Sequence, residues 1–151
     1  MANFQFRLQP VIQLRERARD AAAQAYQQGL QAAQQVEQQI TTLRTEYESQ
    51  RPLQKTSINQ TVQPQKVLES QRFQHQLGLQ IKELQNTLFA VRQEIEKRRL
   101  VLVEAEQKLK SLTKLKERRR EEYLTNEQAK EQNALDHWAG IKYWKSHSDP
   151  S

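Results

Sequence analysis

The sequence is informative first through what it lacks. It contains no cysteine, and only three glycines and four prolines among 151 residues. Without cysteine there are no disulfides, thiolate metal sites or cysteine nucleophiles, which fits a reducing compartment. Few glycines and prolines leave few places for turns. No apolar run approaches the roughly 20 residues that cross a bilayer, and Arg7 interrupts the apolar start, so no signal peptide is expected.

The chain is also poor in apolar residues. Hydrophobic residues make up 36% of it, against about 45–50% in ordinary globular domains. Charged residues of both signs make up 28%, with a net charge of +6. Abundant Gln, Glu, Lys, Arg, Leu and Ala favour long helices with a narrow buried stripe. The basic balance fits an acidic protein surface, nucleic acid or anionic lipid as a partner.

A first helix is predicted over residues 8–50, because apolar or small residues recur there at alternating steps of three and four. Pro10 is tolerated near its start, where the amide has no helical partner. Ile40 and Tyr47 indicate that the stripe drifts after Val36. The expected seam, small in its middle, consists of Leu8, Val11, Arg15, Ala18, Ala22, Ala25, Gly29, Ala32, Val36, Gln39 and Leu43.

A second, longer helix is predicted over residues 66–138, after a tip at 51–65 and before a tail at 139–151. The tip is placed between Pro52 and Pro64, because a proline inside a helix costs about 3 kcal/mol. The second seam is more apolar than the first and consists of Leu77, Ile81, Leu84, Leu88, Val91, Ile95, Arg98, Leu102, Ala105, Leu109 and Leu112.

These elements predict an all-α fold, a single antiparallel coiled-coil hairpin over residues 1–151. At 1.5 Å per residue the second helix is roughly 110 Å long and the first roughly 60 Å, so the second overhangs. With a turn near Ile58, Ala25 is expected to face the region of Val91, and Leu8 that of Lys108. The overhang has a polar seam, so it frays or is held by a partner.

A basic run marks the start of this overhang. It comprises Lys108, Lys110, Lys114, Lys116, Arg118, Arg119 and Arg120, with Glu117 as its one acidic residue. Three interpretations stay open: a solvated helix face, a docking surface for an acidic partner, and a nucleic-acid contact. No aromatic residue is interleaved before Tyr123 and no nucleic-acid recognition motif accompanies the run, so nucleic acid is the least favoured of the three.

Nothing in the sequence indicates catalysis. His75, His137 and His147 lack the spacing of a zinc site, and the three glycines are isolated, so neither metal nor cofactor is expected. A two-helix hairpin also lacks the walls of a catalytic pocket, and we expect no enzyme. Phe73 is either the first core layer of the second helix or an exposed anchor. The aromatic tail, with Trp138, Tyr143 and Trp144, indicates self-packing or partner contact.

The first residues carry the motif F-x-F-x-L-x-x-V-x-x-L-R-E, formed by Phe4, Phe6, Leu8, Val11, Leu14, Arg15 and Glu16. This motif resembles the start of the FliJ family of the flagellar type III export apparatus. The segment from Leu109 to Tyr123, L-x-x-L-x-x-L-K-E-x-x-x-x-E-Y, is similar to the family's C-terminal half. The resemblance covers about residues 4–136. After Leu135 and Asp136, where the family often continues with glutamate, this chain has His137.

The resemblance implies a non-enzymatic, cytoplasmic protein at the periphery of the inner-membrane export apparatus, without direct membrane insertion. Its implied partners are the hexameric flagellar export ATPase, the cytoplasmic region of the export gate, and export chaperones. The residues expected at the ATPase ring are Phe4, Phe6, Leu8, Arg15, Glu16, Lys114, Lys116, Arg118, Arg119 and Arg120. Those expected at the gate are Phe73 and Leu77.

Phe4, Phe6 and Leu8 are expected to lie against Leu109, Leu112 and Leu115, where the first helix runs out. A basic coiled coil that binds nucleic acid, and a passive scaffold, are the alternative functions. The sequence leaves open whether the chain is a monomer or a dimer, and whether the export system is flagellar or a related non-flagellar one.

Overall fold

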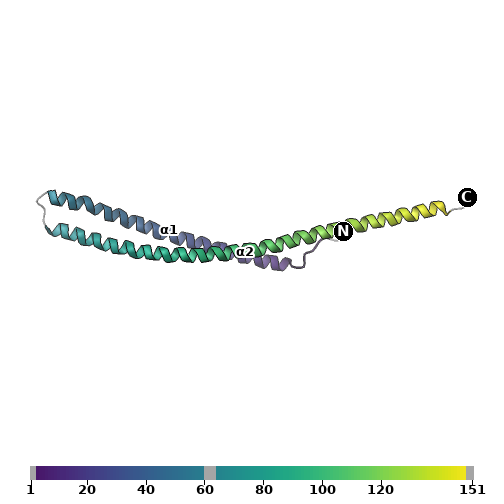
Figure 1. The fold of residues 1–151 in the computed structure, drawn as a ribbon, viewed down its shortest axis with the longest axis horizontal. Coiled ribbons are helices and arrows are strands. Elements are labelled where there is room, and N and C mark those ends of the chain that lie inside the picture. The colour runs from purple at the N-terminus through teal and green to yellow at the C-terminus, as the bar shows by residue number, and fades with distance from the viewer. Residues whose placement is uncertain (1–2, 60–63, 149–151) are drawn as a thin grey trace. The chain divides into compact units, whose positions relative to one another are not determined.

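The computed structural model describes residues 3–59 and 64–148, and nearly all of these lie in two helices (Figure 1). Helix α1 runs over Gln9–Asn59 and α2 over Pro64–His147. The two run antiparallel, and the described residues contain no strand. The predicted all-α hairpin with a longer second helix is therefore confirmed. Within the described residues, neither helix contains a stretch apolar enough to cross a bilayer.

The helix bounds differ from the expected ones at three ends. Helix α1 continues through Pro52 to Asn59, so the expected end near Arg51 is wrong. Pro52 is exposed, and a proline inside a helix removes a single i→i−4 hydrogen bond of the backbone. Helix α2 begins at Pro64, where a proline fits because the first turn needs no amide donor. It continues to His147, because one glycine costs only about 1 kcal/mol in a helix.

The contacts of the chain form two compact units. The central unit is Arg19–Glu104, and the terminal unit combines Met1–Ala18 with Ala105–Ser151. The buried hydrophobic residues that form the core of the central unit are Ala22, Ala33, Ile40, Leu77 and Leu88. Ala33, Ile40 and Leu88 form one cluster with the partly buried residues Val36, Ile81, Leu84, Val91 and Ile95. This core is one layer deep, because two helices alone leave every seam residue close to solvent.

The seam of α2 agrees with the expected one over its whole length. Each of its eleven predicted positions from Leu77 to Leu112 is buried or half-buried. The seam of α1 agrees only in part, because Ala18 and Gln39 are exposed while Ile12, Ala33 and Ile40 are buried. The expected drift after Val36 is confirmed by Ile40, whose exposed fraction is 5%.

The pairing of the helices is shifted by one heptad from the expected register. In the central unit, Arg98 Nη1 donates a hydrogen bond of 2.7 Å to the carbonyl of Ala25, where Val91 was expected. A shift of seven residues keeps a heptad seam in contact, so the apolar pattern does not distinguish the two registers. The expected turn near Ile58 was wrong because α1 extends to Asn59.

Gly29 allows Arg98 to cross the seam. Gly29 is buried, and a Cβ atom placed on it would lie 3.0 Å from Ile95 Cγ1 and 3.7 Å from both Cδ and Nη1 of Arg98. The close approach leaves room for no larger residue without movement of a neighbour. The small middle of the first seam therefore accommodates the one cation in the second seam.

Candidate functional site

The terminal unit begins with an extended segment that leads into α1. Over residues 3–8, exposed side chains alternate with half-buried ones, and Phe4, Phe6 and Leu8 are the half-buried members. An alternation of period two is that of an extended chain, in which successive side chains point to opposite sides. The amide of Gln9 donates to the carbonyl of Phe6 at 3.1 Å, which turns the segment into the helix.

This segment packs against α2 over the described part of the terminal unit. The Phe4 ring lies 5.6 Å from the Tyr123 ring, tilted by 43°, a geometry favourable for aromatic pairs. Phe6 and Leu8 line a groove of about 410 Å³ together with Leu115 and Arg119. We call Phe4, Phe6 and Leu8 the N-terminal clasp. Of the three residues expected beside it, Leu109, Leu112 and Leu115, only Leu115 lines this groove. The ring contact of the clasp lies farther along α2, at Tyr123.

The register shift recurs in the terminal unit. Lys116 Nζ donates a hydrogen bond of 2.8 Å to Gln9 Oε1, so Lys116 and not Lys108 lies beside the start of α1. Lys116 is half-buried, which distinguishes it from the other expected ring contacts on α2. It therefore contributes to closing the hairpin as well as to the local positive charge.

The remaining cations of the expected ring surface are available to a partner. Lys114, Arg118, Arg119 and Arg120 are exposed on α2. Arg119 has an ion pair of 3.7 Å with Glu122, in which both side chains are more than half exposed, and such a pair contributes at most about 1 kcal/mol. We call Lys114, Lys116 and Arg118–Arg120 the basic patch. It shares the terminal unit with the N-terminal clasp, as expected from sequence.

The two α1 residues of that expected surface differ in burial. Arg15 is half-buried and Glu16 is exposed. Both lie in the described part of the terminal unit, within two turns of Gln9. The structure therefore brings Phe4, Phe6, Leu8, Arg15 and Glu16 into the same compact unit as the basic patch.

Near the N-terminal end of α2, the two residues expected at the export gate differ in exposure. Leu77 has an exposed fraction of 3% and belongs to the core, so its side chain is not accessible to a partner. Phe73 is 43% exposed, which contradicts its interpretation as the first core layer. Gln74 takes that position instead, and its Nε2 donates a hydrogen bond of 3.4 Å to the carbonyl of Tyr47. Phe73 and Leu68 line a shallow surface pocket of about 640 Å³.

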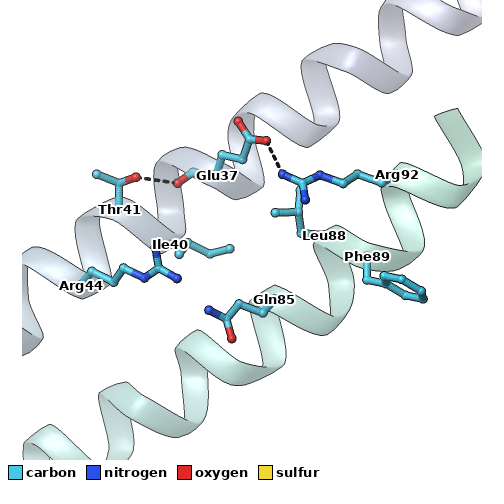
Figure 2. Close-up of a pocket in the computed structure, with 8 residues that line it drawn as sticks. All are labelled: Glu37, Ile40, Thr41, Arg44, Gln85, Leu88, Phe89 and Arg92. Carbon is cyan, nitrogen blue, oxygen red and sulfur yellow. Dashed lines mark hydrogen bonds and ion pairs between the residues drawn. The ribbon is translucent and has the colours of Figure 1, made fainter. Parts of the chain in front are cut away.

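A groove of about 550 Å³ lies between the helices of the central unit. Figure 2 shows Ile40 and Leu88 pointing between the two helices and Phe89 turned away from them. Arg92 Nη2 and Glu37 Oε1 form an ion pair of 3.1 Å across the groove. The sequence does not reveal this groove, because Phe89 lies off the seam and the apolar pattern does not distinguish Phe89 from any exposed residue.

The described side chains hold no constellation of nucleophile, base and orienting group. No group of three or more His, Asp or Glu residues there could hold a metal ion. The resolved pKa shifts belong to one exposed pair: a hydrogen bond from Arg99 lowers the pKa of Glu96, and the same bond raises the pKa of Arg99. Both shifts are those of a surface ion pair. The grooves and exposed cations of the described residues are therefore considered as contact surfaces for other macromolecules.

The sequence model of the family described as "Flagellar FliJ protein" matches residues 4–148. The chain belongs to this FliJ family. The match includes the N-terminal clasp, the basic patch and the whole of α1 and α2. No curated protein and no solved structure is significantly similar to the chain. FliJ proteins are non-catalytic components of flagellar export, and the expected family membership is confirmed.

Proposed function

We propose that the protein is the stalk of the flagellar export ATPase, with the N-terminal clasp and the basic patch as the end that enters the ATPase ring. The observation that carries this proposal is the closure of the terminal unit. The Lys116–Gln9 hydrogen bond and the Phe4–Tyr123 ring contact hold the clasp within one turn of Arg118–Arg120. The packed N-terminal clasp fixes the position of the exposed arginines, and their positive charge is complementary to an acidic, ring-shaped partner.

The ring is expected to bind through charge at the basic patch. Guanidinium groups form bidentate hydrogen bonds with carboxylates, which makes adjacent arginines suitable for acidic loops. Arg118, Arg119 and Arg120 follow one another and point to different sides of α2, as residues 100° apart on a helix do. A ring surrounds its stalk, so cations on several sides of a single helix match several subunits at once.

The test is stimulation of the export ATPase by a triple charge reversal, Arg118→Glu, Arg119→Glu and Arg120→Glu. We expect loss of stimulation with unchanged helicity in circular dichroism, because the three side chains are exposed. The matched control reverses three exposed cations of the central unit, Arg44, Lys82 and Lys97, and is expected to stimulate normally. Normal stimulation by the first variant, or equal loss in both variants, would contradict the assignment.

The opposite end of α2 is proposed to contact the cytoplasmic region of the export gate through Phe73. The exposure of Phe73 and Leu68 supports this, since both are apolar and about half exposed. Phe73→Ala is expected to weaken binding to the purified gate region. Phe89→Ala is the matched control, because Phe89 is 65% exposed on the same helix. Leu77→Ala is unsuitable, since it removes a core side chain. Equal binding by both phenylalanine variants would remove Phe73 from the gate surface.

Links to export chaperones and a cytoplasmic location beside the inner-membrane apparatus complete the proposed function. They are supported by the family membership. A direct measurement is co-purification of the chain with an export chaperone in the presence and absence of the ATPase. Failure of the chain to co-purify with the chaperone, both with and without the ATPase, would contradict the proposed link to export chaperones.

A further inference from the structure

The last three turns of α2 expose large aromatic side chains that nothing else in the described chain covers. Trp138 is 72% exposed and Trp144 is 74% exposed, and Tyr143 and Ile141 accompany them. A Cβ atom added at Gly140 would meet no atom within 4 Å. The ring contact of Tyr143 lies within the same helix, a stack of 4.1 Å on His147. Tryptophans are highly buried on average, so two exposed ones only six residues apart require an explanation.

The charge of the helix changes at the same place. Residues 121–136 carry five carboxylates and one lysine. Residues 137–148 carry Lys142, Lys145, two histidines and no carboxylate. The aromatic side chains and the positive charge therefore coincide on one short segment, which lies between Asp136 and Asp149 in the sequence.

We propose that residues 137–148, the aromatic tail, bind an anionic lipid surface and lie in its headgroup layer. Tryptophan and tyrosine favour this layer, because their rings are apolar on one side and polar on the other. Lysine extends its charge to lipid phosphates while its methylene groups stay with the rings. At 1.5 Å per residue the segment spans roughly 17 Å, too short to cross a hydrocarbon core of about 30 Å, so it lies along the surface.

The spacing of the aromatic residues favours lipid over a partner helix. Trp138, Ile141 and Trp144 recur every third residue, so each step moves about 60° around the helix. A helical partner requires apolar residues at alternating spacings of three and four, which keep them on one face. Trp138, Ile141 and Trp144 are not spaced in this way, so they do not stay on one face. A lipid layer is fluid and requires no register. Lys142 and Lys145 each follow an apolar member directly, which surrounds the rings with positive charge.

The chain supplies its own reporter for this proposal. Its only two tryptophans, Trp138 and Trp144, both lie in the aromatic tail. Tryptophan emission of the full chain therefore reports on this segment alone. We expect a blue shift when vesicles of phosphatidylcholine with phosphatidylglycerol are added, together with sedimentation of the protein with the vesicles. Vesicles of phosphatidylcholine alone should produce a much smaller effect.

Two variants test the contributions separately. Lys142→Gln with Lys145→Gln is expected to weaken binding to the anionic vesicles roughly 30-fold, since each lysine near such a surface contributes about 1 kcal/mol. Trp138→Ala with Trp144→Ala is expected to abolish sedimentation. The matched charge control is Lys82→Gln with Lys97→Gln, exposed lysines of the central unit, and it should bind as the native chain does.

Three results would overturn the proposal. One is equal binding by the native chain and the Lys142/Lys145 variant. Another is a blue shift that appears without vesicles and grows with protein concentration, which would assign the tail to a second copy of the chain. The third is loss of vesicle binding on charge reversal of Arg118–Arg120 alone, which would assign lipid binding to the basic patch. The proposal does not depend on the role of the basic patch at the ATPase.

Discussion

The three glycines of the chain lie in helices but differ in the space around them, which makes them a graded test of how closely the helices approach. A Cβ atom at Gly29 would lie 3.0 Å from Ile95 Cγ1, one at Gly78 would lie 3.8 Å from Tyr47 Cε2, and one at Gly140 would meet nothing within 4 Å. Alanine in place of a helical glycine stabilises by about 0.8–1.0 kcal/mol when it fits.

Gly78→Ala is therefore expected to raise the free energy of unfolding by about 0.8–1.0 kcal/mol. Gly29→Ala should give a net change near zero, because the methyl group forces Ile95 to move. Gly29→Leu should lower the free energy of unfolding by up to about 2 kcal/mol, since overpacking costs about 1–3 kcal/mol and exceeds the gain in helix propensity. Gly140→Ala should increase helix content and leave the unfolding midpoint unchanged, because it touches no other element.

A paired exchange isolates the contact from other effects of the substitution. Gly29→Leu combined with Ile95→Ala swaps the large and the small residue across the seam. We expect a favourable coupling energy of about 0.5–3 kcal/mol relative to the two single variants. The assay is urea unfolding followed by far-ultraviolet circular dichroism. Strict additivity, or a Gly29→Leu variant as stable as Gly78→Ala, would refute the packing of Gly29 on Ile95 and with it the helix register.

Three further predictions concern other parts of the chain. Ile40→Ala should lower the free energy of unfolding by about 2–5 kcal/mol in the same assay, because Ile40 is a buried core residue. Phe4→Ala should remove an aromatic pair worth about 0.5–1.5 kcal/mol, seen as a changed Tyr123 ring shift in NMR spectra and no change in the central unit. Arg99→Gln should raise the pKa of Glu96 in an NMR titration, because it removes the hydrogen bond that lowers this pKa below the ordinary 4.5. In the native chain, the stability that the Glu96–Arg99 pair contributes is therefore present above pH 4.5 and is lost as the pH falls through the lowered pKa of Glu96.

The helices were predictable from the sequence because the second seam is strongly apolar. From Leu77 to Leu112 the steps of three and four place most of the apolar positions on one face of the helix. The buried face of the first helix was harder to predict, because alanine and glycine bury little area and so do little to determine which face packs against the second helix. Ala18 and Ala22 are equivalent by composition, yet only Ala22 is buried.

The register could not be predicted from the apolar pattern, because a heptad repeat is unchanged by a shift of one heptad. Specific contacts distinguish the two arrangements, above all the hydrogen bond from Arg98 to Ala25 beside Gly29. The turn was predicted too early in the chain because a proline usually ends a helix, whereas Pro52 lies inside α1. The residues that the sequence groups with the N-terminal clasp fall in one compact unit, but Lys116 rather than Lys108 lies beside the start of α1.

The antiparallel pairing also determines the order in which the chain is expected to close. The hydrogen bond between Ser70 and Gln50 joins residues 20 apart in sequence, whereas the bond between Lys116 and Gln9 joins residues 107 apart. Closing the longer loop directly costs roughly 1.5 kcal/mol more in chain entropy. Folding that starts near the connection and proceeds outward avoids this cost, so the clasp forms last and opens first. Native-state hydrogen exchange would show this as faster exchange at Ile12 than at Ile40, and the reverse order would exclude it.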